Sequence, residues 1–198
     1  MLEEDIAGTK LNENENPATY TTNKLTVRRA CDNASIILRF IQLLCENHNI
    51  NLQNCLRQQS HQDGKQKARS FDMCSYLSKC FEQFNNLLNN QTFDVVNQLV
   101  ETLKEMIQGP CKQNQISLVN SKIIDSSREY IAGFEKESEL MHLGFESEED
   151  IDSLGEFKKQ VTILLTSLLE GEVDMEIIHR MAFSIDFNMM KNRMLIVF

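Results

Sequence analysis

Residues 37–59 read ILRFIQLLCENHNINLQNCLRQQ, and this stretch decides the expected fold. Four large apolar side chains recur there at the i, i+3, i+4, i+7 spacing of one helix face: Ile37, Phe40, Ile41 and Leu44. That spacing is typical of an amphipathic helix, expected from about Asn33 to Asn47 with this face in the core. A break at His48-Asn49 precedes a second, short helix, whose inward side chains are expected to be Leu52, Cys55 and Leu56.

The same helical spacing recurs through the rest of the chain. Further helices are expected over about 70–89, 93–108, 114–134, 156–170, 175–185 and 187–197. Gly109-Pro110 is a helix stop, and Asn114 or Gln113 is expected to cap the helix that follows. No segment alternates with period 2, and 198 residues hold only 7 Gly and 2 Pro. The sequence therefore predicts an all-α fold, an armadillo-like stack or irregular bundle of about seven or eight helices.

Composition shifts along the chain suggest its organisation. Residues 1–29 are expected to be a disordered or weakly ordered N-terminal segment, because they are polar and lack periodic apolar positions. Residues 30–198 are expected to form one helical domain, with an acidic loop at about 135–156 that Gly144 and Gly155 interrupt. The last residues, MLIVF, are apolar and end in mid-pattern, so the chain is expected to be cut from something longer.

Charge and hydropathy narrow the classes of partner. The formal net charge is -9, which argues against nucleic acid and against an anionic membrane surface, since both need a basic face. No run of about 18 apolar residues occurs, so no direct membrane insertion by this segment is expected. The six cysteines, most of them within apolar helical patterns, are interpreted as reduced, buried side chains.

No motif predicts a reaction, and the chain is not expected to be an enzyme. It has no CxxC or HExxH ligand pair, no GxSxG nucleophile and no glycine-rich phosphate loop, so catalytic, cofactor and metal residues are all predicted as none. Asp150, Asp152 and Gly155 look superficially like a calcium loop, but Leu154 and Val161 fall where oxygen ligands belong. Lys65, Lys67 and Arg69 are interpreted as a solvated loop rather than a phosphate site.

Three stretches together resemble one family. Residues 37–59 resemble the inositol-trisphosphate receptor form, EMIQGPCKQNQISLV at 105–119 is similar to both the inositol-trisphosphate and ryanodine receptor branches, and LLTSLLEGEV at 164–173 looks more like the ryanodine receptor form. The region is the one often called the RIH-associated domain. The motif residues assigned a structural role are Arg39, Phe40, Leu44, Cys45, Glu46, Asn47, His48, Leu52, Gln53, Asn54, Leu56, Arg57, Gln108, Gly109, Pro110, Cys111, Asn114, Gln115 and Gly171.

The resemblance implies a role in calcium release. In that family the region is an α-helical cytosolic module between ligand-sensing N-terminal modules and the pore, and it helps relay conformational change to the gate. The implied partners are other domains or subunits of a tetrameric calcium-release channel at the cytoplasmic face of the endoplasmic reticulum. The chain shows no β-trefoil core and no pore helices, so it is expected to be a channel fragment or a truncated relative. The alternative is a free-standing, cytoplasmic helical scaffold that binds a protein partner.

The motif residues suggest architecture rather than catalysis. Polar side chains gather at and just after the break at His48-Asn49, among them Gln53 and Asn54. Buried side-chain amides are expected there to satisfy the unpaired backbone groups of the two helix ends.

Overall fold

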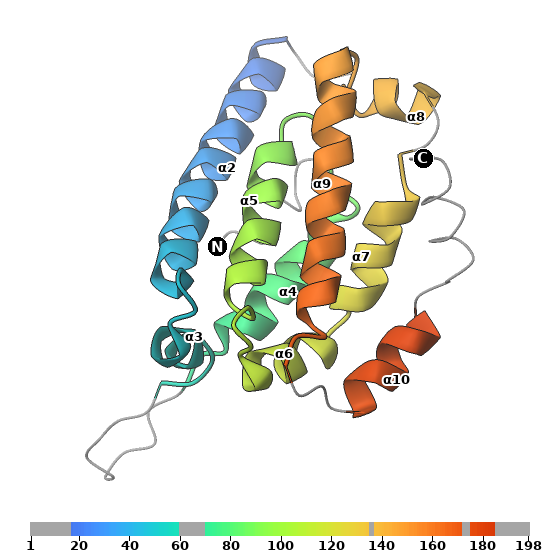
Figure 1. Ribbon diagram of the computed structural model, residues 1–198. Coiled ribbons are helices and arrows are strands. Elements are labelled where there is room, and N and C mark those ends of the chain that lie inside the picture. The colour runs from blue at the N-terminus through green and yellow to red at the C-terminus, as the bar shows by residue number, and fades with distance from the viewer. Residues whose placement is uncertain (1–16, 60–69, 135–136, 172–174, 185–198) are drawn as a thin grey trace.

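The computed structural model describes residues 17–59, 70–134, 137–171 and 175–184. These parts of the chain form nine helices and no strand (Figure 1). The helices are α2 (Pro17–Cys45), α3 (Ile50–Arg57), α4 (Met73–Phe84), α5 (Phe93–Glu105), α6 (Lys112–Val119), α7 (Ile123–Ala132), α8 (Glu137–His142), α9 (Glu148–Ser167) and α10 (Met175–Ser184). The all-α prediction is confirmed, and the arrangement is the irregular bundle rather than a regular stack.

Helix α5 lies at the centre of the bundle. It packs against α2, α4 and α9, and α9 packs in turn against α7. In Figure 1, α2, α5 and α9 stand side by side and run in the same direction, so that their C-terminal ends lie at the same end of the molecule. The short helices α3 and α6, together with α10, lie across that end.

The sequence of α5 explains its position. Val95, Val96, Leu99, Val100 and Leu103 are all buried, and they occupy more than one face of this helix. A helix with apolar side chains on several faces must be surrounded by other elements. Helices α2, α4 and α9 cover these faces of α5.

Aromatic side chains join α4, α7 and α9. The ring of Tyr130 lies 4.7 Å from that of Phe81 and 5.4 Å from that of Phe157, measured between centroids. The Tyr130 hydroxyl donates a hydrogen bond of 3.2 Å to the Phe81 carbonyl. Burial raises the pKa of the Tyr130 phenol, so this group stays a neutral donor across the physiological range.

The first helix differs from its prediction in length and in orientation. It begins at Pro17 rather than near Asn33, so part of the expected N-terminal segment is helical. The side chains that face α5 are Cys31, Leu38, Ile41 and Cys45, while Ile37 and Phe40 are exposed. The prediction of the buried face was wrong at these two positions because α2 carries apolar residues on two sides, and periodicity alone does not say which side meets the core.

The acidic stretch was also interpreted wrongly. Residues 137–142 form α8, and α9 begins at Glu148, well before the end of the loop expected at about 135–156. The Ser147 side chain accepts a hydrogen bond from the Asp150 backbone, and the Asp150 carboxylate accepts one from the Ser147 backbone. This reciprocal capping box starts the helix and lowers the pKa of Asp150. Acidic side chains in a first helical turn are favourable, so the charge pattern indicated a helix start.

Two further boundaries differ from prediction. The helix expected over 114–134 is divided into α6 and α7. Helix α6 begins at Lys112 with Cys111 at its N-cap, so Asn114 and Gln113 both lie inside the helix and neither caps it. In α3, Gln53 is buried and Cys55 is exposed, which reverses the expected inward face at Cys55. The expected pattern over 187–197 and the basic loop residues Lys65, Lys67 and Arg69 lie outside the described residues. None of the described helices is long and apolar enough to cross a bilayer.

Candidate functional site: a buried junction of amide side chains

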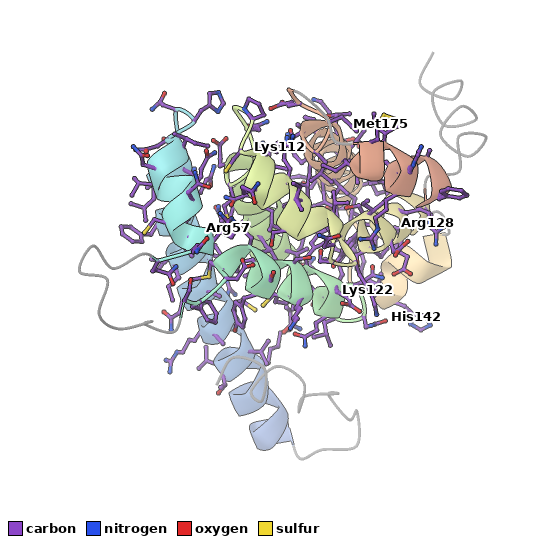
Figure 2. The ribbon with its side chains drawn as sticks, turned by 90° about the horizontal axis from the view of Figure 1, so that it is seen from below. Arg57, Lys112, Lys122, Arg128, His142 and Met175 are labelled. Carbon is purple, nitrogen blue, oxygen red and sulfur yellow. The ribbon has the colours of Figure 1, made fainter. Side chains whose placement is uncertain are left out.

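The three sequence motifs meet at one end of the bundle. Figure 2 views this end, where α3, α6 and α10 spread across the surface and Arg57 and Lys112 mark the end of α3 and the start of α6. Four side-chain amides gather there, and we call them the amide junction: Gln53, Gln108, Asn114 and Gln115. They come from α3, the turn after α5, and α6.

Gln53 joins α3 to the end of α5. Its Nε2 donates to the carbonyl oxygen of Glu105 at 2.7 Å and to that of Gln108 at 2.9 Å. The side chain is 1% exposed. The carbonyls in the last turn of a helix have no partner within the helix, and Gln53 supplies one from another element. The sequence had predicted that such amides would serve the two helices at the break, whereas Gln53 serves a helix remote in the chain.

Asn114 is the most enclosed member of the amide junction. Its Nδ2 donates to the carbonyl of Gln53 at 3.0 Å and to that of Met106 at 2.9 Å, so α6 holds both α3 and the end of α5. Its Oδ1 accepts from Arg57 Nε at 3.2 Å. Both N–H groups of Nδ2 and the Oδ1 of Asn114 therefore have hydrogen-bond partners, as a buried amide requires.

Gln115 and Gln108 extend the amide junction to α9. Gln115 Nε2 donates to the carbonyls of Ser167 at 2.9 Å and Glu170 at 3.2 Å, at the C-terminal end of α9. Gln108 Nε2 donates to Ser167 Oγ at 3.2 Å. Adjacent residues of α6, Asn114 and Gln115, therefore bind the ends of two different long helices.

Two tight turns abut beside these amides. Gly109 has φ +95°, and a Cβ built on it would lie 2.3 Å from the Cβ of His48. His48 and Asn47 themselves have positive φ, 56° and 59°. Gly171 has φ +80°, and a Cβ there would lie 2.5 Å from Cγ of Pro110. Glycine is needed at both positions for conformation and for space.

The other predicted motif residues differ in how they lie relative to the amide junction. Arg57 contacts the amide junction directly, by donating to Asn114, whereas the Oδ1 of Asn54 accepts from Cys111 Sγ at 3.8 Å. The side chains of Leu44, Leu52 and Leu56 are partly exposed, and Leu56 packs against the hydrophobic core. Arg39 and Phe40 lie outside the junction, where Arg39 forms an exposed ion pair of 3.7 Å with Glu46.

Buried thiols line the same region. Burial raises the pKa of Cys45 to about 12, and it also raises those of Cys74 and Cys111. Because the thiolate is the reactive form, these groups stay protonated and unreactive near neutral pH. Within the described residues, no three His, Cys, Asp or Glu side chains gather as a metal site would require.

Sequence reasoning missed Ser167 and Glu170. Ser167 accepts from Gln108 through its hydroxyl and from Gln115 through its carbonyl, and a Glu170 oxygen accepts from the Gly109 backbone at 3.3 Å. Both lie in the quoted stretch LLTSLLEGEV, of which only Gly171 was singled out. A signal was present, since Ser167 is a small polar residue on an otherwise apolar helix.

The fold and the amide junction define an all-helical module in which polar side chains tie helix ends together. Residues 29–131, just over half of the chain, match the family model described as RyR and IP3R Homology associated. The chain belongs to this family, and the resemblance inferred from the three motifs is confirmed.

One relative of the chain is an inositol-trisphosphate receptor. The chain is 39% identical over 84 residues to the inositol 1,4,5-trisphosphate receptor itr-1 of Caenorhabditis elegans. The match covers 40% of this chain and 3% of the worm receptor. The chain thus corresponds to a small part of that relative's length.

Proposed function

We propose that this chain is a regulatory and coupling module in the cytosolic part of an intracellular calcium-release channel, without catalytic or conducting activity of its own. The family membership supports the channel context. The observation that carries the coupling role is the amide junction, because it connects α3, α5, α6 and α9 through side chains from all three motifs.

Hydrogen bonds to helix ends suit a mechanical role. A displacement of α3 would move Gln53 against two carbonyls at the end of α5, and α6 would carry the movement to α9 through Gln115. Each bond contributes about 1 kcal/mol net, but a buried carbonyl left unpaired costs about 1–3 kcal/mol. The helices are therefore expected to move together rather than to separate. The close-packed core adds to this, since protein interiors compress little.

The proposed partners are other domains or subunits of the channel, which is a tetramer in the receptors that the sequence resembles. The proposed location is the cytoplasmic face of the endoplasmic reticulum membrane. The relative's printed name supports a receptor context of this kind. A free-standing cytoplasmic scaffold is the alternative, and the exposed apolar side chains Ile36, Phe40 and Leu43 of α2 support it, because such a face indicates a protein partner.

The first experiment separates these two functions. An antibody raised against residues 60–70 would be used to measure the size and membrane association of the native protein. A membrane-bound species far larger than 22.9 kDa is expected for a channel component. A soluble species near 22.9 kDa would contradict the channel role and leave the scaffold.

A second experiment tests coupling directly. Gln53→Met keeps the length of the side chain but removes the donors to α5. Hydrogen exchange is expected to accelerate at the end of α5 and also at residues 165–171, the end of α9. Gln113→Met, on the exposed side of α6, is the matched control and should change neither region. Acceleration confined to α3 and α5 would contradict coupling through the amide junction.

A further inference from the structure

Helix α2 exposes a large apolar surface on the side away from α5. Ile36, Phe40 and Leu43 follow the i, i+4, i+7 spacing of one helix face, and their residues are 69%, 61% and 48% exposed. We call these three residues the α2 stripe. The same spacing on the buried face of α2 makes the seam with α5, so the α2 stripe has the pattern of a second helix–helix seam.

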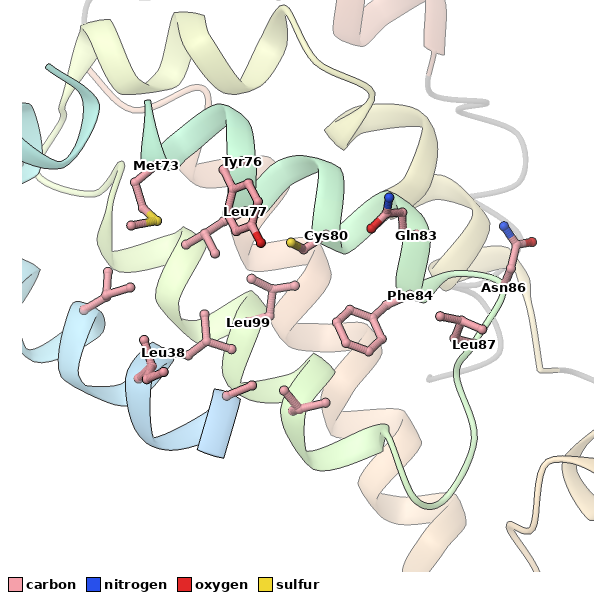
Figure 3. A pocket seen from close by; sticks show the side chains of 14 residues that line it. Leu38, Met73, Tyr76, Leu77, Cys80, Gln83, Phe84, Asn86, Leu87 and Leu99 are labelled. Atoms are coloured by element: carbon pink, nitrogen blue, oxygen red, sulfur yellow. The ribbon is translucent and has the colours of Figure 1, made fainter. Parts of the chain in front are cut away.

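A groove adjoins the α2 stripe. Helices α2 and α4 both pack on α5, but within the described residues their backbones do not approach each other closely. The groove between them has a volume of about 420 Å³, and its floor is formed by Leu99 of α5. Figure 3 shows the walls facing each other across this floor, with Leu38 on one side and Met73, Tyr76 and Cys80 on the other.

The lining of the groove is almost entirely apolar and includes adaptable side chains. Met73, which is flexible, and Cys80, which is small, both lie on the α4 wall, with Tyr76 and Leu77 between them. Ile37, 56% exposed, stands on the rim between the groove and the α2 stripe, so that the two form one continuous surface. Soluble proteins rarely expose a contiguous apolar surface of this kind without a partner.

Charge indicates the chemistry of the partner. Helix α2 contains one Lys and three Arg against one Asp, in a chain whose formal net charge is -9. Arg39 borders the α2 stripe, where it lines a shallow hollow together with Ile36, Phe40 and Leu43, and its pairing with Glu46 at 3.7 Å leaves half of its side chain exposed to a partner. An acidic partner would meet these cations favourably. A second copy pairing symmetrically through this face would instead oppose the same basic residues to each other.

We propose that the groove and the α2 stripe bind an amphipathic helix of a partner protein, with apolar side chains at i, i+3, i+4, i+7 and an acidic polar face. The partner's apolar side chains enter between α2 and α4, as in other helix-in-groove complexes, and its carboxylates lie toward the arginines of α2. This inference stands independently of the proposed channel role, because it rests on the surface of α2 and α4 alone.

The test uses a display library of peptides about 20 residues long, with fixed apolar positions at helical spacing and either acidic or basic residues elsewhere. Selection on the full chain is expected to enrich acidic helical peptides, whose affinity falls as salt rises. Ile37→Glu and Phe40→Glu should each weaken binding of the selected peptides about tenfold or more. Ile151→Glu, at an equally exposed apolar site on α9, is the matched control and should leave affinity unchanged.

Three results would overturn the proposal. The first is selection of peptides without helical spacing or without acidic character. The second is equal binding to the Phe40→Glu variant, provided that its thermal unfolding matches the parent chain, as expected for an exposed site. The third is a different occupant: self-association in sedimentation, or binding to vesicles of phosphatidylcholine and phosphatidylserine, that Phe40→Glu abolishes while peptide binding is absent.

Discussion

The amide junction and the α2 stripe are opposites within one small molecule. At the junction polar side chains are buried, with Asn114 0% exposed, whereas on α2 large apolar side chains face the solvent. From hydropathy alone, the amide side chains would be expected at the surface and the apolar side chains of the α2 stripe in the core. An interior amide is therefore stable when its donors bind carbonyl oxygens, while an exterior apolar face stays exposed only until a partner covers it.

The two regions also differ in how they constrain the chain. At the amide junction each amide has directional partners on other helices, so the relative positions of α3, α5, α6 and α9 are specified. The α2 stripe does not fix the position of a neighbouring helix in this way, because apolar contact is non-directional. Four experiments test the contributions of buried and exposed side chains to this difference.

The largest effect is expected from Phe81→Ala. Phe81 is fully buried against Tyr130, so removal of its ring should lower the free energy of unfolding by about 3–5 kcal/mol. Phe40→Ala is the control, expected to change it by less than about 0.5 kcal/mol because the ring is exposed. Chemical denaturation measures both. A large loss at Phe40 would mean that the outer face of α2 is core after all.

A smaller loss is expected from Asn114→Leu, which removes both donors of the central amide. The carbonyls of Gln53 and Met106 then lose a partner, and the free energy of unfolding should fall by about 3 kcal/mol. Asn51→Leu, at an exposed position on α3, serves as the control. If the two variants unfolded alike, the junction would contribute nothing to stability.

Gly109→Ala should cost about 2 kcal/mol, since φ is positive and the added methyl group meets His48. The double variant Gly109→Ala with His48→Gly should recover part of the loss by removing the clash. Gly155→Ala gives the opposite sign, because Gly155 lies within α9 with open space around it, and a gain of about 0.5–1 kcal/mol is expected. Thermal unfolding distinguishes these outcomes.

The smallest effect concerns alkaline pH. The pKa of Cys45 is raised to about 12 from an ordinary value near 9, so the folded chain keeps a proton that the unfolded chain loses. The contribution of this thiol to stability should be constant below pH 9 and fall as pH rises above 9, by at most about 1.4 kcal/mol up to pH 10. Denaturation at pH 7, 9 and 10 checks this. The slope should be smaller in Cys45→Val and unchanged in Cys55→Val, whose thiol is exposed; equal slopes in both would exclude Cys45 as a source.

Sequence reasoning reached the fold class because helical periodicity and the stop at Gly109-Pro110 are local signals. It failed on the face of α2, since Phe40 and Leu38 fit two different apolar stripes of the same helix and only the position of α5 decides between them. It also placed Asn114 as a cap, because Asn is favoured at helix starts. The partners of Asn114 and Gln53 are carbonyls more than fifty residues away or across a turn, and no spacing in the sequence identifies them.

The shared direction of α2, α5 and α9 gives the molecule an electrical polarity (Figure 1). Parallel helices add their dipoles, with partial negative charge where the C-terminal carbonyls gather and partial positive charge at the far end. The first turns at that far end carry acidic residues, Asp94 on α5 and Glu148, Glu149 and Asp150 on α9. At the carbonyl end the compensation comes from the N–H groups of neutral amides, from Lys104 in the last turn of α5 and from Arg57 in the last turn of α3. Ionic strength should therefore act unequally on the two ends, weakening the compensation by exposed carboxylates and sparing the buried amides.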